Sequence, residues 1–319
     1  MENIEKVIAI VVTYNRKKLL MECLQALDRQ TYPLEKIIIV DNASTDDTVE
    51  MIKSFKVESR FPLDILSLEK NIGGSGGFYE GMKYARDSQN TDFVWIMDDD
   101  TIPEQDALQY LLMAVDNIRK SDFKENVAYF ISTALAENCK DFMNVPAIDT
   151  KQGENGYPIW HQFLKFGLVR ITFATFVSML IPIDVLNCCG LPVRDYFLWG
   201  DDSEYTLRLQ KNYGCGYLVG NSRVIHKRKN GKNLSFQDET ESSRIKLYYY
   251  SFRNSCINDI VYKKPKNIYR YFWNKIKTLK SLIYSSHGWL KIQIASKGIF
   301  DGCFRNKKFV EFIQKEIKK

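Results

Sequence analysis

Short, continuous apolar runs recur along the first hundred residues, and each run ends abruptly in polar residues. The runs are Val7–Val12, Ile37–Val40 and Val94–Met97. Such runs, rich in β-branched side chains, are typical of strands buried on both faces of a sheet. Between them, apolar residues recur at helical spacing, as in Leu19–Leu27. Because strands that alternate with helices pair in parallel through right-handed crossovers, the pattern predicts an α/β fold with a doubly wound sheet.

A glycine-rich segment, Asn71–Gly77, stands among these elements. As a loop it could bring backbone amides against a phosphate, because glycine permits close approach and unusual φ values. It lacks the Gly-Lys-Ser/Thr of a P-loop and does not follow the first strand, so a nicotinamide or flavin enzyme is disfavoured. The remaining predictions are helices at 48–55, 78–86 and 105–119, strands at 63–68, 173–181 and 217–220, and loops with short strands at 128–167.

Three carboxylates, Asp98–Asp100, follow directly on the apolar run that ends at Met97. They lie at the carboxyl end of a predicted strand, where open α/β sheets bind ligands. Adjacent acids repel one another, and a divalent cation that takes carboxylate and phosphate oxygens would relieve the repulsion. The alternative is a solvated acidic turn, because Thr101–Glu104, with its proline and glutamate, is typical of a helix start.

A second acidic group lies much further along the chain, in Trp199–Tyr205. Its acids open a predicted helix, where a single carboxylate would simply complement the helix dipole. Three acids within four residues, beside a tryptophan and a glycine, exceed what that role needs. A carboxylate placed there can act as a general base toward a sugar hydroxyl. The histidine at 226 has no neighbours that mark it as a ligand, and a lone histidine is more often structural.

Basic residues are concentrated at the C-terminus. Residues 261–319 hold fifteen Lys and Arg against three acids, although the whole chain carries a net charge of only +6. The stretch Lys263–Trp273 mixes basic and aromatic residues, a composition that on a helix suits a surface of anionic lipids. No recognisable nucleic-acid module accompanies the charge, so we do not expect nucleic acid as a partner. The alternative is a solvated helical face.

No segment is predicted to cross a membrane. The longest apolar run, Ile171–Ile183, has thirteen residues and contains Thr, Ser and Pro, which is too short for a spanning helix. The seven cysteines are scattered without a Cys-x-x-Cys pair, which indicates reduced thiols rather than disulfides or structural zinc. The stretch before the first strand is too short for a signal peptide. Together these features predict a cytoplasmic protein, held peripherally at the inner face of the cell membrane.

Several motifs follow one another in order between residues 5 and 255. They are Val-Val-Thr-Tyr-Asn-Arg at 11–16, Val-Asp-Asn-Ala-Ser-Thr-Asp at 40–46, Asn-Ile-Gly-Gly-Ser-Gly-Gly at 71–77, Asp-Asp-Asp at 98–100 and Trp-Gly-Asp-Asp-Ser-Glu-Tyr at 199–205. In this order they resemble the family 2 inverting glycosyltransferases with the GT-A fold. The Tyr-rich stretch at 248–254 is similar to the galactofuranosyltransferase and rhamnosyltransferase branch. The resemblance implies a catalytic domain at 1–235 with a mixed, doubly wound sheet, and a basic, mostly helical region at 236–319 for membrane or acceptor association.

The resemblance also implies roles for individual residues. Those that bind the nucleotide part of the donor would be Thr13, Arg16, Asp41, Gly74, Asp98 and Asp99. The ligands of Mn²⁺ or Mg²⁺ would be Asp98, Asp100 and His226. Asp202 would be the catalytic base, and the residues that contact donor or acceptor would be Trp199, Asp201 and Glu204. The glycine between Trp199 and the acids departs from the family pattern and leaves the choice between Asp201 and Asp202 open.

The reaction that the resemblance implies is transfer of a sugar from a UDP- or dTDP-sugar to a lipid-linked glycan in cell-surface polysaccharide synthesis. UDP-galactofuranose is the first choice of donor and dTDP-rhamnose the second, and the chain could also form a homo-oligomer. Two other classes stay open. A sugar nucleotidyltransferase would use the first acidic group but would need a basic, glycine-rich loop at the first strand. A non-catalytic glycan-binding protein would have no need of an Asp-x-Asp pair.

Overall fold

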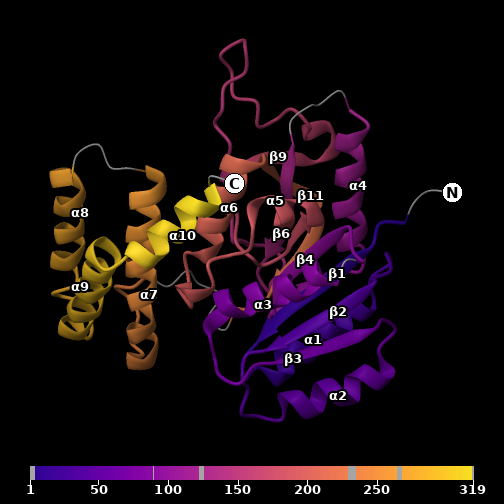
Figure 1. The fold of residues 1–319 in the computed structure, drawn as a ribbon, viewed down its shortest axis with the longest axis horizontal. Helices are drawn as coiled ribbons and strands as arrows, with labels where there is room; N and C mark the ends of the chain where they lie inside the picture. The colour runs from indigo at the N-terminus through magenta and orange to yellow at the C-terminus, as the bar shows by residue number, and fades with distance from the viewer. Residues whose placement is uncertain (1–3, 89, 122–125, 229–234, 264–267, 318–319) are drawn as a thin grey trace.

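The computed structural model describes residues 4–88, 90–121, 126–228, 235–263 and 268–317. Within these ranges eleven strands form one sheet, with helices on both faces (Figure 1). Its order is β3-β2-β1-β4-β10-β6-β11-β9-β8, with β5 beside β11 and β7 beside β6. The strands are β1 Val7–Thr13, β2 Lys36–Asp41, β3 Leu63–Ser67, β4 Phe93–Asp98, β5 Thr101–Pro103, β6 Val127–Leu135, β7 Phe142–Met143, β8 Ala147–Ile148, β9 Leu168–Phe173, β10 Met179–Pro182 and β11 Cys215–His226.

The first half of the sheet is the parallel one that the alternating pattern predicts. β3, β2, β1 and β4 pair in parallel, whereas β10 runs antiparallel between β4 and β6, so the whole sheet is mixed. The register places Thr13 opposite Asp41 and Val12 opposite Asp98. The carboxyl ends of β1, β2 and β4 therefore lie together at one edge, where such sheets bind ligands.

Alternate residues of β1 enter two separate apolar layers, one on each face of the sheet. Val7, Ala9 and Val11 pack with residues of α1, α2 and α4, whereas Ile8, Ile10 and Val12 pack with residues of α3, α5 and α6. Burial of each valine or isoleucine side chain contributes about 1.5–3 kcal/mol, so β1 is a central stabilising element. The helices are α1 Lys17–Asp28, α2 Thr48–Glu58, α3 Gly73–Asp87, α4 Ala107–Arg119, α5 Ile183–Cys189, α6 Asp201–Asn212, α7 Ser242–Asn258, α8 Ile268–Ser281, α9 Gly288–Phe304 and α10 Lys307–Ile317.

Two predictions beside the site are wrong. The segment Thr101–Glu104 does not start a helix, because its first three residues form β5 and pair with β11, and α4 begins only at Ala107. The glycine-rich segment is not a loop, because α3 begins at Gly73. A Cβ added to Gly77 would lie 2.4 Å from Val12 Cγ1, so glycine here lets the helix pack directly on β1.

The second half of the sheet departs further from prediction. The nine-residue strand β6 lies within the segment expected to hold loops and short strands. The strand expected at 173–181 is replaced by β9 and β10, which residues 174–178 separate. The strand expected at 217–220 is the middle of β11, which has twelve residues. Pairing between segments far apart in sequence decides these boundaries, and local composition does not reveal it.

The C-terminal region is helical, as predicted, and stands beside the sheet (Figure 1). A small apolar cluster joins it to the segment before α6, with Val193 and Tyr196 packing against Ile257, Val261 and Ile313. No helix in the described part of the chain is both long and apolar enough to span a membrane.

Candidate active site

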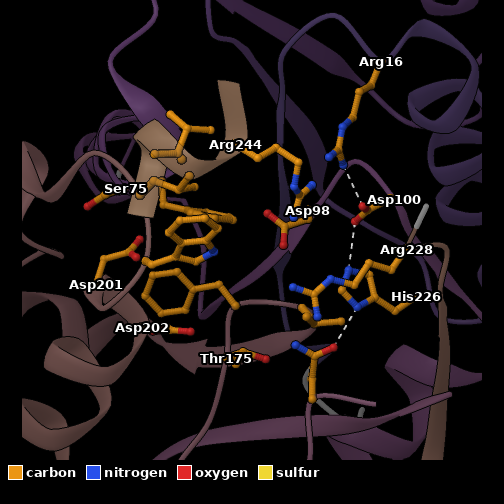
Figure 2. A pocket seen from close by; sticks show the side chains of 18 of the residues that line it. Arg16, Ser75, Asp98, Asp100, Thr175, Asp201, Asp202, His226, Arg228 and Arg244 are labelled. Atoms are coloured by element: carbon orange, nitrogen blue, oxygen red, sulfur yellow. Dashed lines mark hydrogen bonds and ion pairs between the residues drawn. The ribbon is translucent and has the colours of Figure 1, made fainter. Parts of the chain in front are cut away.

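One cavity of about 480 Å³ lies beside the ends of β1 and β4. Both acidic groups of the sequence reach it: Asp98 and Asp100 on one side, Asp201 and Asp202 on the other (Figure 2). The predicted site residues that line it are Arg16, Gly74, Asp98, Asp100, Trp199, Asp201, Asp202 and His226. Residues from opposite ends of the polypeptide thus share one cavity.

Strand pairing brings the first acidic group to His226. β5 follows Asp100 directly and pairs antiparallel with the end of β11, which places Thr101 opposite His226. The backbone N–H of Lys227 then donates to the carbonyl of Asp100 at 2.8 Å. Ligand atoms of Asp98, Asp100 and His226 all lie within 4.8 Å of one another, a spacing that fits three ligands of one metal ion.

The hydrogen bonding of His226 shows that this group fits a cation. Its Nδ1 lies 2.7 Å from Asn144 Oδ1, which can only accept, so Nδ1 carries the proton. In the neutral ring Nε2 then presents a lone pair, and it lies 3.1 Å from Asp100 Oδ1. That oxygen is buried without a hydrogen-bond donor among the described residues. Adjacent ligand atoms around an octahedral ion with bonds of about 2.1 Å are about 3 Å apart, so two acceptors at this separation suit a divalent cation between them.

The electrostatics of the first group point the same way. Burial, and then the charge of Asp100, raise the pKa of Asp98 to about 8. Burial also raises the pKa of Asp99 to about 6, against the opposing charge of Arg16. Arg16 Nη1 lies 2.6 Å from Asp100 Oδ2 and 3.2 Å from Asp99 Oδ1. One arginine thus neutralises part of a group of three carboxylates, and a divalent cation would complete the neutralisation.

The second group stands at the N-terminus of α6, after a loop of unusual backbone conformation. Phe197, Trp199 and Gly200 have φ values of 68°, 59° and 84°. Burial, and then the charge of Asp202, raise the pKa of Asp201 to about 7. Burial also raises the pKa of Asp202, against hydrogen bonds that its carboxylate accepts from Ser203. Carboxylates with raised pKa values in a cavity are suited to proton transfer near neutral pH.

Four predicted site residues do not line the cavity. Thr13 and Asp99 lie behind it and bond to each other, since Thr13 Oγ1 donates to Asp99 Oδ2 at 2.7 Å. Asp41 is buried at the end of β2 and accepts from Ser44 N. Glu204 is fully buried in an ion pair with Arg208, with Nε and Oε1 2.8 Å apart. The structure thus gives these four side chains partners within the protein.

Other lining residues were missing from the sequence prediction. Arg228 and Arg244 line the cavity from outside the expected motifs (Figure 2). Asn144, which also lines the cavity, lies in the segment 128–167, where the sequence predicts only loops and short strands. No local sequence signal marks it as a site residue. Tyr248 belongs to the Tyr-rich stretch at 248–254, which the resemblance links to a branch of the family and to no role in the site, and its ring centroid lies 4.7 Å from that of Trp199.

Comparison with known proteins identifies the family. Residues 8–157 match the model of glycosyl transferase family 2. The chain thus carries a glycosyl transferase family 2 domain over these residues. The matched part carries strands β1 to β4 and the first acidic group, and the second acidic group lies beyond it.

Two curated relatives illustrate the sequence similarity of this family 2 glycosyltransferase. Galactofuranosyltransferase GlfT1 of Mycolicibacterium smegmatis is 32% identical over 114 residues, which are 36% of each chain. A dolichyl N-acetyl-alpha-D-glucosaminyl phosphate 3-beta-D-2,3-diacetamido-2,3-dideoxy-beta-D-glucuronosyltransferase of Methanococcus voltae is 33% identical over 204 residues, which are 63% of this chain and 60% of that protein. The chain thus spans only about a third of the length of the first relative.

A solved structure of another protein has the same fold as this chain. The structure of GalNAc-T7 with UDP, GalNAc and Mn²⁺ superposes with a TM-score of 0.61 at 15% identity, covering all of this chain and 57% of that one. The GT-A fold predicted from the motifs is confirmed. That neighbour holds Mn²⁺, and Asp98, Asp100 and His226 form a group that could hold a metal here.

Proposed function

We propose that the protein transfers a sugar from a nucleoside-diphosphate sugar to a hydroxyl group of a lipid-linked glycan, with inversion at the anomeric carbon. One observation carries the proposal: the metal-binding group and the pair Asp201 and Asp202 line the same cavity. A nucleotidyltransferase would need only the first group, and a glycan-binding protein would need neither. Two acidic groups across one cavity are what a reaction needs when a diphosphate leaves on one side and a hydroxyl attacks from the other.

The roles follow from the chemistry of each side chain. Asp98, Asp100 and His226 would hold Mn²⁺ or Mg²⁺, which when bound supplies positive charge against the leaving diphosphate. Arg16, also in the cavity, would contact the same phosphates. Asp202 would accept the proton of the acceptor hydroxyl, whose oxygen attacks the anomeric carbon from the face opposite the leaving group. Asp201 and Trp199 would orient the two sugars.

The residues behind the cavity would support the nucleotide site indirectly. Thr13 and Asp99 would fix the position of Arg16. Arg16 Nη1 donates to Asp99 Oδ1, and Thr13 Oγ1 donates to Oδ2 of the same carboxylate. Gly74 has no atom within 4 Å of an added Cβ, so it leaves open space at the cavity wall. Asp41 would meet the nucleotide base only if donor binding opened the end of β2, where it is now buried.

UDP-galactofuranose is the donor that we favour. The similarity to galactofuranosyltransferase GlfT1 and the Tyr-rich stretch that contributes Tyr248 to the cavity support this choice. dTDP-rhamnose is the second candidate. The test is release of nucleoside diphosphate from a panel of sugar nucleotides, with and without a chelator. We expect turnover of one UDP- or dTDP-sugar that the chelator abolishes, and release of pyrophosphate from a sugar phosphate and a nucleoside triphosphate would indicate a nucleotidyltransferase instead.

A lipid-linked acceptor suits the surface of α8 and α9. Tyr269, Trp273 and Ile276 recur at helical spacing on α8, and these side chains are 86%, 53% and 42% exposed. Trp289, on α9, is 86% exposed. Exposed aromatic residues on a strongly basic region suit an anionic membrane, where each Lys or Arg contributes about 1 kcal/mol. We therefore place the protein peripherally on the cytoplasmic face of the membrane, and the predicted homo-oligomer stays a prediction.

Flotation with vesicles tests the membrane proposal. The wild-type protein should float with vesicles that contain phosphatidylserine at low salt, and Trp273→Ala combined with Trp289→Ala should reduce the floated fraction. Absence of flotation at low salt would contradict it.

A further inference from the structure

The loop before the second acidic group is held by one side chain from the C-terminal helical region. Asn254, on α7, is fully buried. Its Nδ2 lies within hydrogen-bond distance of three carbonyl oxygens of this loop: 3.0 Å from that of Tyr196, 3.2 Å from that of Leu198 and 2.6 Å from that of Trp199. Arg253 Nε donates to Asn254 Oδ1 at 2.9 Å, which keeps the amide turned so that its N–H groups face the loop.

A second asparagine, one helical turn further along α7, holds the next residue of the loop. Asn258 Nδ2 donates to the carbonyl of Gly200 at 2.9 Å, and its Oδ1 accepts from the hydroxyl of Tyr196 at 2.8 Å. The same Gly200 carbonyl accepts from the backbone N–H of Glu204, the first hydrogen bond of α6. The two asparagines therefore reach the residues that immediately precede Asp201.

The backbone conformation of this loop explains why it needs such support. Phe197 and Trp199 have positive φ values, which cost L-residues of order 1–2 kcal/mol each and persist only where surrounding contacts impose them. Gly200 also has positive φ, and a Cβ there would lie 3.0 Å from Asn254 Cβ. The conformation turns the chain sharply into α6, where Asp201 and Asp202 enter the cavity.

The other side of the loop rests on α3. The carbonyl of Phe197 accepts from the backbone N–H of Ser75, and the hydroxyl of Ser75 donates to the carbonyl of Val193 at 2.6 Å. A Cβ on Gly73 would lie 2.0 Å from the Phe197 oxygen, so this contact requires glycine. The loop is thus held by hydrogen bonds to α3 on one side and to α7 on the other.

We infer that Asn254 is a positioning residue for the proton-accepting step, acting through the backbone of residues 196–200 to place Asp201 and Asp202 against the acceptor. The inference rests on the proposed function of that pair. Asn258 supports the same placement through Gly200. In this arrangement α7 positions catalytic side chains of the active site, although it lies beyond the predicted end of the catalytic domain at 235.

The test uses two substitutions in the full chain. Asn254→Ala removes the amide N–H groups that face the three carbonyl oxygens, and Asn254→Asp keeps the size of the side chain but turns a carboxylate toward these oxygens. Because misplacement of a catalytic group by about 1 Å costs roughly a hundredfold in rate, we expect kcat to fall roughly a hundredfold and donor KM to change much less. Asn306→Ala is the matched control, since Asn306 Nδ2 also donates to a backbone carbonyl, that of Gly302, at 2.6 Å, away from the cavity.

Hydrogen exchange provides a readout that does not depend on turnover. In both variants, exchange should rise in peptides covering 193–206 and stay unchanged in β1 and β4. Wild-type kcat in both variants would overturn the inference, as would a rise in exchange spread over the whole sheet. If the wild-type protein itself turned over no sugar nucleotide, the proposed function would fail. Exchange confined to 193–206 would then still support the positioning of this loop by Asn254, and unchanged exchange there would overturn it.

Discussion

Asn144 and Asp100 contact opposite nitrogens of the same imidazole: Asn144 Oδ1 lies 2.7 Å from Nδ1 of His226, and Asp100 Oδ1 lies 3.1 Å from Nε2. Asn144 thus sets the tautomer and the orientation of a ring that faces the metal-binding group. Loss of such an outer partner typically costs 10–100-fold in metal affinity. We expect Asn144→Ala to weaken Mn²⁺ binding by about that factor in calorimetric titration. Asn138→Ala, at an exposed site in the same segment, should bind as the wild type does, and equal affinity of both variants would refute the role of Asn144.

Asp202→Asn should separate binding from turnover. The amide keeps the shape of the side chain but cannot accept a proton, so we expect kcat to fall by at least about a hundredfold while donor binding stays nearly intact. Asp201→Asn should retain more activity if Asp202 is the base. Should the two variants show the reverse order, the base is Asp201, and full activity of both would remove the pair from the mechanism.

The pH dependence of kcat/KM should report the second acidic group. Burial raises the pKa of Asp202 above its ordinary value, and a general base must be ionised, so activity should rise with pH above the range in which an exposed carboxylate titrates. Asp201→Asn removes a negative neighbour of Asp202, which should lower the pKa of Asp202 and shift the rise in activity to lower pH. Profiles measured with saturating metal would show the shift. A midpoint that stays in place or moves upward would contradict this coupling.

Thermal unfolding should depend jointly on pH and metal. The pKa of Asp98 is about 8 in the folded chain against an ordinary value of 3.8. The metal-free folded state therefore binds more protons than the unfolded state between these values, and its stability falls as pH rises through that window. A bound cation replaces those protons, so Mn²⁺ should raise Tm more at pH 8 than at pH 5. At pH 8 and a hundredfold excess over Kd, the rise in Tm should be on the order of 5 °C. Asp98→Asn should weaken both dependences, and an equal metal effect at both pH values would exclude this linkage.

Glu204 should prove to be a stabilising residue. Its carboxylate bonds to Arg208 through both oxygens and accepts from the Tyr262 hydroxyl at 2.7 Å, with no exposed surface on either member of the ion pair. Glu204→Ala leaves Arg208 buried without its counter-charge, which costs about 3–5 kcal/mol. Denaturant unfolding should show this loss, whereas Glu311→Ala, in an exposed pair with the same helical spacing, should change little. A stable Glu204→Ala protein with a raised KM would favour the predicted contact with substrate instead.

The parts of this structure that the sequence predicts are those with a local signal. The run Val7–Val12 is apolar on both faces because both faces are covered, and its alternate residues pack in two layers. The acids at 98–100 and 201–202 stand out because carboxylates are rarely grouped at the ends of apolar elements. Their convergence on one cavity is implied only by the resemblance of the ordered motifs to the family, and the structure brings them together.

What could not be predicted depends on contacts between distant segments. β5 reads as a helix start because proline and glutamate favour one, yet its pairing with β11 prevails. Asn144 reaches His226 across 82 residues of chain, and Asn254 reaches Trp199 across 55. Asparagine is common in ordinary turns and surfaces, so neither residue carries a mark of its role before the chain is folded.

The short ladder between β5 and β11 has a consequence for how this chain can vary. Because main-chain bonds set Thr101 opposite His226, the separation of Asp100 and His226, the two proposed metal ligands, is fixed by the number of residues between Asp100 and the ladder rather than by which side chains β5 carries. Exchanges of side chains along β5 that keep their size and packing should leave this separation unchanged. Insertion of a single residue between Asp100 and Thr101, or loss of one residue of β5, would turn the neighbouring side chains to the opposite face and would part the aspartate from the histidine, however well the rest of the sheet survived.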